Sequence, residues 1–204
     1  MADPELRDVP EQWPVADRSY PYDGDGWVLK LRADWIRRPG HPDEAPFKRL
    51  AVEHPGAAVV LALDDEDRAL CLWQYRHAVG QRLVQLPAGL LDVDGEDPLT
   101  VARRELIEEG GYEAAEWVEL PAMYSSPGIS GERVHYFLAR GLTEVGRGDF
   151  EPEHEEAEMQ IGWVPLRDLH DAVLAGRLGD AHLALAVLLA GSRLAPSQRR
   201  GTDH

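Results

Sequence analysis

Hydrophobic residues fall mostly into short runs and alternating stretches along this chain, which predicts more strands than helices. The near-continuous apolar run Ala57–Leu63 predicts a central strand, and Ala69–Tyr75, after an acidic turn, predicts its hairpin partner. Further strands are expected at residues 82–86, 117–124, 134–140 and 159–164. Helices are expected at residues 98–109, 166–174 and 181–189. Strands interrupted by a few helices predict an α/β fold, an α/β/α sandwich around a mixed β-sheet.

The N-terminal region follows a different pattern. Residues 1–20 are polar and interrupted by prolines, so they are expected to be irregular. Residues 27–35 alternate like a strand with one buried face, and Phe47–Glu53 predicts a second strand. The aromatic residues here have no obvious covering surface. We therefore expect an N-terminal β extension (1–46) that forms a homodimer, a core domain (47–191) and a polar tail (192–204).

Composition narrows the class of protein. The 204 residues carry a net charge of −16, which disfavours nucleic acid and anionic membranes as partners. The sequence contains no signal-peptide pattern and no apolar run of membrane-spanning length. The single cysteine, Cys71, lies in an apolar run and is expected to be buried and reduced. These features indicate a soluble, cytoplasmic protein.

One helix carries the candidate chemistry. It is predicted to begin after Asp97, a suitable N-cap, with Pro98 in its first turn. Gly110-Gly111 is expected to end it. If this helix is regular, its glutamates at 105, 108 and 109 share one face.

These three like charges repel one another, and the helix macrodipole disfavours anions near the C-terminal end. Arg104 can relieve part of the repulsion through Glu108, four residues later. A bound divalent cation would neutralise the rest. Carboxylate oxygens suit Mg²⁺ or Mn²⁺ better than zinc. The simpler alternative is a solvated acidic face.

The residues around this helix resemble the signature of the Nudix hydrolases. That signature reads Gly, five residues, Glu, seven residues, Arg-Glu, an apolar residue, any residue, Glu-Glu, any residue, Gly and an apolar residue. From Glu96 to Tyr112 the match is complete. Six residues rather than five separate Gly89 from Glu96, because Gly95 stands at the expected glutamate position. The preceding segment, residues 86–92, resembles the ADP-ribose pyrophosphatase branch, and the resemblance covers residues 47–191.

The resemblance implies an α/β/α sandwich and a metal-dependent hydrolase, with Mg²⁺ as cofactor and Mn²⁺ able to substitute. Glu105 and Glu109 are the first-choice metal ligands, and Glu108 is a third ligand or an outer-shell partner. The resemblance also implies the carbonyl of Ala88 as a further metal ligand. Arg104 belongs to the implied catalytic residues, as the one that orients a glutamate, and Glu96 has either a structural or a functional role.

A general base must reach the attacking water. In similar pyrophosphatases a glutamate from the loop after the second strand beyond the signature helix closes over the substrate, and Glu155 and Glu156 both fit that place. His154 is an alternative base. Glu132 matches a glutamate of this branch that helps to bind metal or substrate.

Substrate binding requires cations, because the substrate is anionic. Arg76 matches a phosphate-binding arginine of the branch, and its alternative is a surface ion pair. Gly89 belongs to the implied substrate-binding set, and Arg49 could reach across a dimer interface. Trp35 or Tyr22 could stack on adenine.

Two classes of function therefore follow. The first is an enzyme that hydrolyses the pyrophosphate bond of ADP-ribose, or of a related nucleoside diphosphate sugar, to a nucleoside monophosphate and a sugar phosphate. The second is a Nudix-like sensor that binds a nucleotide sugar without turnover. Sensors usually lose signature glutamates or carry a basic extension, and this sequence does neither. The enzyme is the favoured hypothesis.

Overall fold

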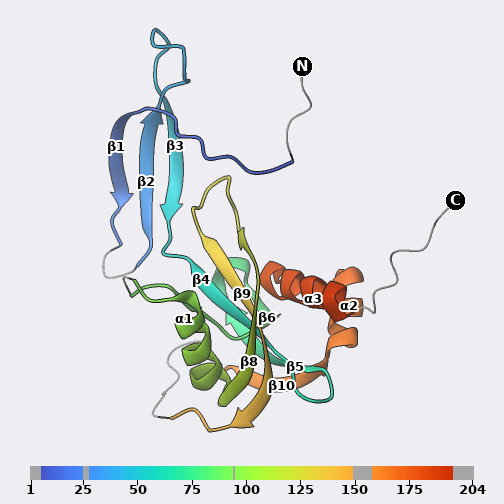
Figure 1. Cartoon of the computed structure of the whole chain (residues 1–204). Coiled ribbons are helices and arrows are strands. Elements are labelled where there is room, and N and C mark those ends of the chain that lie inside the picture. The colour runs from blue at the N-terminus through green and yellow to red at the C-terminus, as the bar shows by residue number, and fades with distance from the viewer. Residues whose placement is uncertain (1–5, 25–27, 94, 149–157, 195–204) are drawn as a thin grey trace, which may run out of the picture. The chain divides into compact units, whose positions relative to one another are not determined.

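The computed structural model describes residues 6–24, 28–93, 95–148 and 158–194. These residues form two compact units (Figure 1). The smaller unit comprises the chain up to His54 together with Ser126–Gly131, and the larger unit comprises the rest. The structural division thus lies after His54, whereas the sequence placed the start of the core domain at residue 47.

The smaller unit is a three-stranded antiparallel sheet in the order β1-β2-β3. Its strands are β1 (Val15–Tyr22), β2 (Lys30–Ile36) and β3 (Phe47–Glu53). The expectation that residues 1–20 are irregular was therefore wrong for the part that forms β1. Every residue of β1 is exposed, so the strand shows no hydrophobic alternation. It is held by its ladder with β2 and by Arg18, whose Nε lies 2.6 Å from Asp34 Oδ1.

The larger unit contains two sheets. Its strands are β4 (Ala57–Ala62), β5 (Arg68–Arg76), β6 (Gln81–Gln85), β7 (Ala88–Leu90), β8 (Tyr112–Tyr124), β9 (Arg133–Glu144) and β10 (Gln160–Pro165). One sheet has the order β7-β4-β9-β8 and is mixed, because β4 and β9 run parallel. The other has the antiparallel order β10-β5-β6. A short 3₁₀ turn, η1 (His77–Val79), links β5 to β6.

The expected hairpin between the strands now labelled β4 and β5 was wrong. Both strands exist, but their pairing is limited to a bridge between Leu63 and Ala69 and the hydrogen bond from Asp64 N to Arg68 O. Both edges of β4 are already occupied, by β7 and β9. Beyond the turn, β5 therefore enters the second sheet.

Helices cover both faces of the mixed sheet, as the predicted sandwich requires (Figure 1). Side chains of β4 point alternately to opposite faces. On one face, Ala58 and Val60 pack with Val101 of α1 (Pro98–Glu105). On the other, Val59 and Leu61 pack with residues of α2 (Leu166–Leu174) and α3 (Ala181–Leu194). None of the helices within the described ranges is long and apolar enough to cross a membrane.

Candidate active site

The helix that carries the glutamates begins as its sequence predicts. Asp97 is extended, and its side chain accepts a hydrogen bond of 3.2 Å from the backbone N–H of Leu99. Pro98 occupies the first turn, where a missing N–H leaves no intrahelical bond unmade. The cap and the proline together fix where α1 starts.

The end of this helix differs from the regular α-helix that was predicted. The α-helical part stops at Glu105, and Leu106–Gly110 form a π-helical turn, η2. Gly111 then adopts a left-handed conformation with a φ of 81°, which favours glycine. Hydrogen bonds in a π turn span five residues instead of four, so side chains are spaced differently around the axis. The spacing of the three glutamates around the axis therefore departs from that of the regular helix that was predicted.

Two of the glutamates turn into the protein. Glu105 is 8% exposed and Glu109 is 7% exposed. Oε2 of Glu109 accepts a 2.8 Å hydrogen bond from the backbone N–H of Ala88 on β7. A Cβ atom placed on Gly89 would lie only 2.0 Å from Oε1 of Glu105. Both buried carboxylates thus lie against the same two residues of β7, and Gly89 lets Glu105 approach.

Glu108, the third glutamate, pairs with Arg104. Nη1 of Arg104 lies 2.8 Å from Glu105 Oε1 and 3.1 Å from Glu108 Oε2. Burial alone would lower the pKa of Arg104, but the carboxylates of Glu105 and Glu108 outweigh this effect and the pKa is raised above its usual value. Arg104 is therefore a permanent cation placed between two carboxylates.

Arg147 makes a contact with the end of this helix that sequence reasoning missed. Its Nε donates a 2.7 Å hydrogen bond to the backbone oxygen of Glu108, near the end of η2. Cations are favourable where helix carbonyls lack partners. Arg147 lies in a glycine-rich segment beyond β9, far from the signature in sequence, and its surroundings offer no local signal for this role.

A divalent cation fits the donor atoms of this site in part. Glu105 and Glu109 supply buried hard oxygen atoms, and Oε2 of Glu96 is buried without a hydrogen-bond partner in the structure. Glu96 also lies close enough to Arg104 to raise its pKa. Within the described residues, however, no three acidic, histidine or cysteine side chains converge on one point. Arg104 engages Glu108, and the Ala88 N–H engages Glu109.

The candidate substrate residues come from different elements of the chain. Arg76 ends β5 with an exposed side chain, and its Nε donates a 2.5 Å hydrogen bond to Gln85 Oε1. Glu132 accepts a short hydrogen bond from the hydroxyl of Ser125. Arg49 belongs to β3 of the smaller unit, where its guanidinium lies 4.4 Å from the ring of Phe47.

The other candidates belong to the smaller unit or lie outside the described residues. The possible stacking residues Trp35 and Tyr22 lie in the smaller unit, where Lys48 approaches the Trp35 ring and Tyr22 bonds to a backbone oxygen. The candidate bases His154, Glu155 and Glu156 lie outside the described residues.

A polar cluster at the start of α3 is a second feature that sequence reasoning missed. Asp180 is only 8% exposed, and it caps the helix by accepting a 2.7 Å hydrogen bond from the Leu183 N–H. Next to it, the Tyr136 hydroxyl lies 2.7 Å from Nδ1 of His182. Burial, reinforced by the charge of Asp180, raises the pKa of Tyr136 to about 12. The hydroxyl is therefore neutral at physiological pH.

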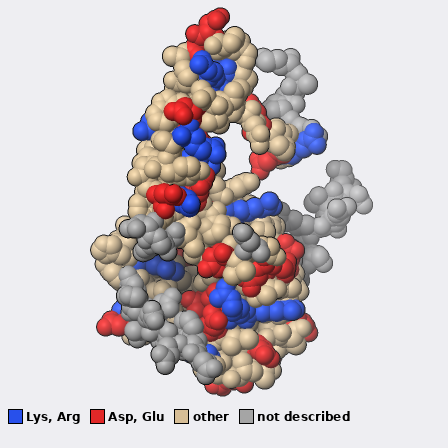
Figure 2. Space-filling model, turned by 90° about the vertical axis from the view of Figure 1, so that its left-hand side faces the viewer, with Lys and Arg blue, Asp and Glu red and all other residues tan. Residues whose placement is uncertain are grey.

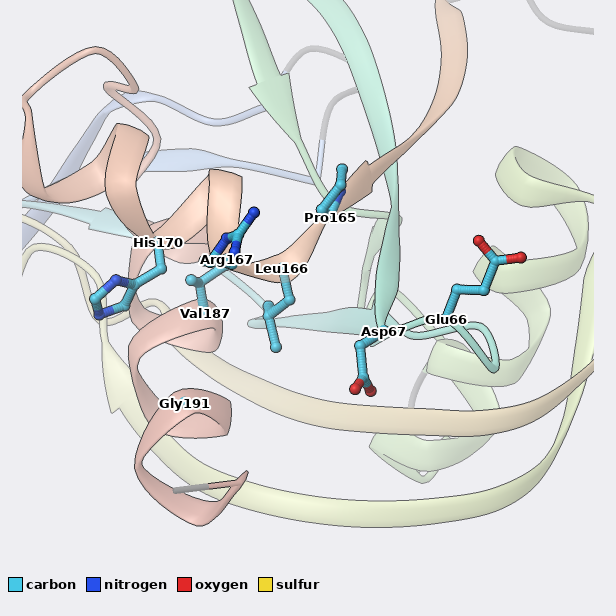
Figure 3. Close-up of a pocket in the computed structure, with 8 residues that line it drawn as sticks. All are labelled: Glu66, Asp67, Pro165, Leu166, Arg167, His170, Val187 and Gly191. Atoms are coloured by element: carbon cyan, nitrogen blue, oxygen red, sulfur yellow. The ribbon is translucent and has the colours of Figure 1, made fainter. Parts of the chain in front are cut away.

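Two further features concern the surface of the molecule, namely its charge and one of its cavities. Acidic and basic side chains are interspersed on the face that Figure 2 shows, so the net charge of −16 does not form an unbroken acidic surface on that face. A cavity of about 380 Å³ lies where Leu166 and His170 of α2 meet Val187 of α3 and the turn at Asp67 (Figure 3). None of the candidate site residues that the structure describes lines this cavity.

Comparisons with known proteins identify the family of this chain. The NUDIX domain model matches residues 52–185. The chain is 44% identical over 165 residues to an ADP-ribose pyrophosphatase of Mycobacterium tuberculosis, covering 81% of this chain and 77% of that protein. It is 37% identical over 147 residues to an ADP-ribose pyrophosphatase of Bacillus subtilis, covering 72% and 77%. A crystal structure of an ADP compounds hydrolase superposes with a TM-score of 0.73 at 17% identity, covering 95% of this chain and all of the other. The chain therefore belongs to the NUDIX family.

Proposed function

We propose that the protein is a Nudix hydrolase that cleaves the pyrophosphate bond of ADP-ribose or of a related nucleoside diphosphate sugar. The products are AMP, or another nucleoside monophosphate, and a sugar phosphate. The observation that carries this proposal is the burial of Glu105 and Glu109 against Ala88 and Gly89. Two carboxylates held against one strand within a complete signature helix favour an enzyme over a sensor.

The cofactor we propose is Mg²⁺, with Mn²⁺ able to replace it, as is usual for a family that works with divalent metals. Glu105, Glu109 and the carbonyl oxygen of Ala88 would hold it, with Glu108 as a further ligand once Arg104 releases it. A divalent cation bound there supplies neutralisation of the phosphates and acidification of a water molecule. Arg104 orients Glu105 through their 2.8 Å contact.

The reaction itself needs a base and a departing phosphate. Water attacks one phosphorus atom, the bond from that phosphorus to the bridging oxygen breaks, and the other phosphate leaves. The proton of the water passes to Glu155 or Glu156, both in the loop where the resemblance places the base. Glu132, which matches a glutamate of this branch, is the next candidate; its carboxylate accepts a hydrogen bond from Ser125, just after β8.

Substrate recognition rests on Arg76, Arg49 and Gly89. Arginine binds phosphate oxygens in a bidentate manner, which suits Arg76 at its exposed strand end. Arg49 would contribute from the partner subunit of a homodimer formed by residues 1–46. The fully exposed β1 supports this assembly, because such a strand has a face available for a second copy. The unpaired and buried Cys71 fits a reducing, cytoplasmic compartment.

Product analysis tests the function. Purified protein is incubated with ADP-ribose, GDP-mannose, UDP-glucose and NADH, with Mg²⁺, with Mn²⁺ and with excess chelator. We expect AMP and ribose 5-phosphate from ADP-ribose with either cation and no product with chelator. Reaction in ¹⁸O-labelled water identifies the phosphorus that is attacked. Turnover of none of these compounds, or full activity with excess chelator, would disprove the proposal.

A further inference from the structure

A chain of hydrogen bonds connects the start of α3 to Arg76. Buried Asp180 uses Oδ1 to cap α3 at the Leu183 N–H, and its Oδ2 accepts a 2.6 Å hydrogen bond from Nε2 of Gln85. Oε1 of Gln85 in turn accepts the 2.5 Å hydrogen bond from Nε of Arg76. Gln85 thus joins a buried helix cap to an exposed cation.

The direction of these hydrogen bonds is fixed by chemistry. An ionised aspartate can only accept, so the amide of Gln85 must turn its NH₂ group toward Asp180. The amide oxygen of Gln85 then has to face Arg76, whose guanidinium can only donate. Asp180 therefore sets the orientation of the amide, and the amide sets the position of the guanidinium.

Arg76 is paired with the neutral side chain of Gln85 rather than with a carboxylate. Several arginines of the larger unit pair with carboxylates, among them Arg68 with Asp64 and Arg140 with Asp67. Arg76 is instead held by a neutral amide, and no carboxylate in the described part of the chain pairs with it. Its positive charge is therefore not neutralised by these residues, and Gln85 engages only Nε. The two terminal amino groups remain suitably placed for bidentate binding of a phosphate.

Gln85 lies only three residues before the strand that contacts the buried carboxylates. Gln85 is the last residue of β6, and Ala88, which bonds to Glu109, begins β7. Three residues of fully extended chain span at most about 11 Å. This short segment therefore connects the residue that holds Arg76 to the strand that contacts Glu105 and Glu109.

We propose that Gln85 and Asp180 are positioning residues that orient Arg76 for binding of a substrate phosphate. This inference rests on the proposed function, because it requires that Arg76 contacts the substrate. Asp180 thus has two roles: its Oδ1 caps α3, and its Oδ2 orients the amide of Gln85 and thereby Arg76.

The variant Asp180→Asn separates these two roles. Asparagine caps helices as well as aspartate does, so its Oδ1 keeps the bond to Leu183. Its NH₂ group then faces the NH₂ group of Gln85, and the amide must turn over. A donor of Gln85 then meets the donor of Arg76, and the guanidinium loses its support. We expect KM for ADP-ribose to rise about 10-fold, with kcat changed less than threefold and with the thermal midpoint nearly unchanged.

Two further variants test whether the effect passes through Arg76. Gln85→Ala removes the link without touching the cap, and it should raise KM to the same degree. In an Arg76→Ala background, Asp180→Asn should add no further increase in KM, because residues that act through one another are not additive. Asp64→Asn is the matched control, since this carboxylate also accepts backbone hydrogen bonds, at 2.8 Å from Arg68 N and 3.0 Å from Glu66 N, outside the hydrogen-bond chain. Its KM should stay at the wild-type value.

Calorimetric binding of ADP-ribose in excess chelator provides a readout without turnover. We expect Kd to rise about 10-fold in Asp180→Asn. Wild-type KM and Kd in both Asp180→Asn and Gln85→Ala would overturn the inference while leaving the proposed function intact. An Asp180→Asn effect that persists in full in the Arg76→Ala background would overturn it as well. Failure of the wild-type protein to bind and to hydrolyse ADP-ribose or any of the other compounds of the product analysis would overturn the proposed function and the inference together.

Discussion

Gly89→Ala is the sharpest test of the proposed carboxylate site, because it adds one methyl group at the place where Glu105 approaches β7. The new Cβ would lie 2.0 Å from Oε1, 2.2 Å from Cδ and 2.5 Å from Cγ of Glu105. The backbone itself accepts alanine, since Gly89 is not among the glycines with positive φ. The effect of the substitution is thus a collision with one side chain.

The size of the effect follows from these distances. Non-bonded carbon atoms approach to about 3.5 Å, so the Glu105 carboxylate must move by more than about 1 Å. A misplacement of about 1 Å can cost about 10²-fold in rate. Overpacking of a buried site costs about 1–3 kcal/mol of folding free energy. We therefore expect a loss of about 10²-fold in kcat/KM and a rise in the Mg²⁺ concentration needed for half-maximal rate.

The assay combines initial rates of ADP-ribose hydrolysis over a range of Mg²⁺ concentrations with unfolding in urea. Gly128→Ala is the control, because a Cβ at Gly128 meets nothing within 4 Å and its φ is not positive. That variant should behave as wild type. In a Glu105→Ala background the collision partner is gone, so Gly89→Ala should no longer destabilise the fold.

Two results would refute this reasoning. One is a Gly89→Ala protein with wild-type kcat/KM and Mg²⁺ dependence, which would mean that the position of Glu105 does not matter for catalysis. The other is a destabilisation that is equally large with and without Glu105. In that case the added methyl group collides with something else.

Three other perturbations follow from the site, the sheet and the core. Glu109→Gln should lower the rate at least 10²-fold and weaken the Mg²⁺ dependence. Glutamine at the true base, Glu155 or Glu156, should instead lower kcat and flatten the acid limb of the pH–rate profile, with the metal requirement unchanged. Losses of only a few-fold in both loop variants would place the base elsewhere. Deletion of residues 1–46 should convert a dimer to a monomer in light scattering and lower activity, and a monomeric full-length protein would contradict the proposed assembly. Burial raises the pKa of the Cys71 thiol from 9.0 to about 12. Above pH 9 the unfolded state therefore releases a proton that the folded state keeps, and the free energy of unfolding decreases as pH rises. Between pH 8 and pH 10 this amounts to about 1.4 kcal/mol, and urea unfolding of Cys71→Ala should show a correspondingly smaller decrease; an equal decrease would assign it to other groups.

The sequence was informative where a single physical signal decides the outcome. The apolar run at β4 could only be a buried strand, and the periodicity of α2 placed its bounds as predicted. It was misleading at β1, whose residues are exposed and carry no alternation, and at β5, where adjacency in the chain suggested a hairpin. β5 cannot pair with β4 because β7 and β9 already occupy both edges of β4. The local sequence does not reveal which strands occupy those edges.

The same contrast holds for the candidate site. The signature named Glu105 and Glu109, since a motif of fixed spacing carries them both. The π turn was not predictable, because a change in hydrogen-bond register within a helix leaves the order of residues unaltered. Nor could Gln85 and Asp180 be paired from the sequence, since 95 positions separate them and neither stands in a recognisable motif.

The discontinuous smaller unit has a consequence for the order of events during protein synthesis. Val52 of β3 bonds to the loop between β8 and β9: its N–H donates a 2.7 Å hydrogen bond to Ile129 O, and its oxygen accepts a 3.4 Å hydrogen bond from the Gly131 N–H. At about 5–20 residues per second, the ribosome needs roughly ten seconds after Val52 to deliver that loop. The N-terminal sheet is thus translated first but completed only when β8 of the larger unit has also been made. For this chain, the common rule that the N-terminal unit folds first is therefore expected to fail.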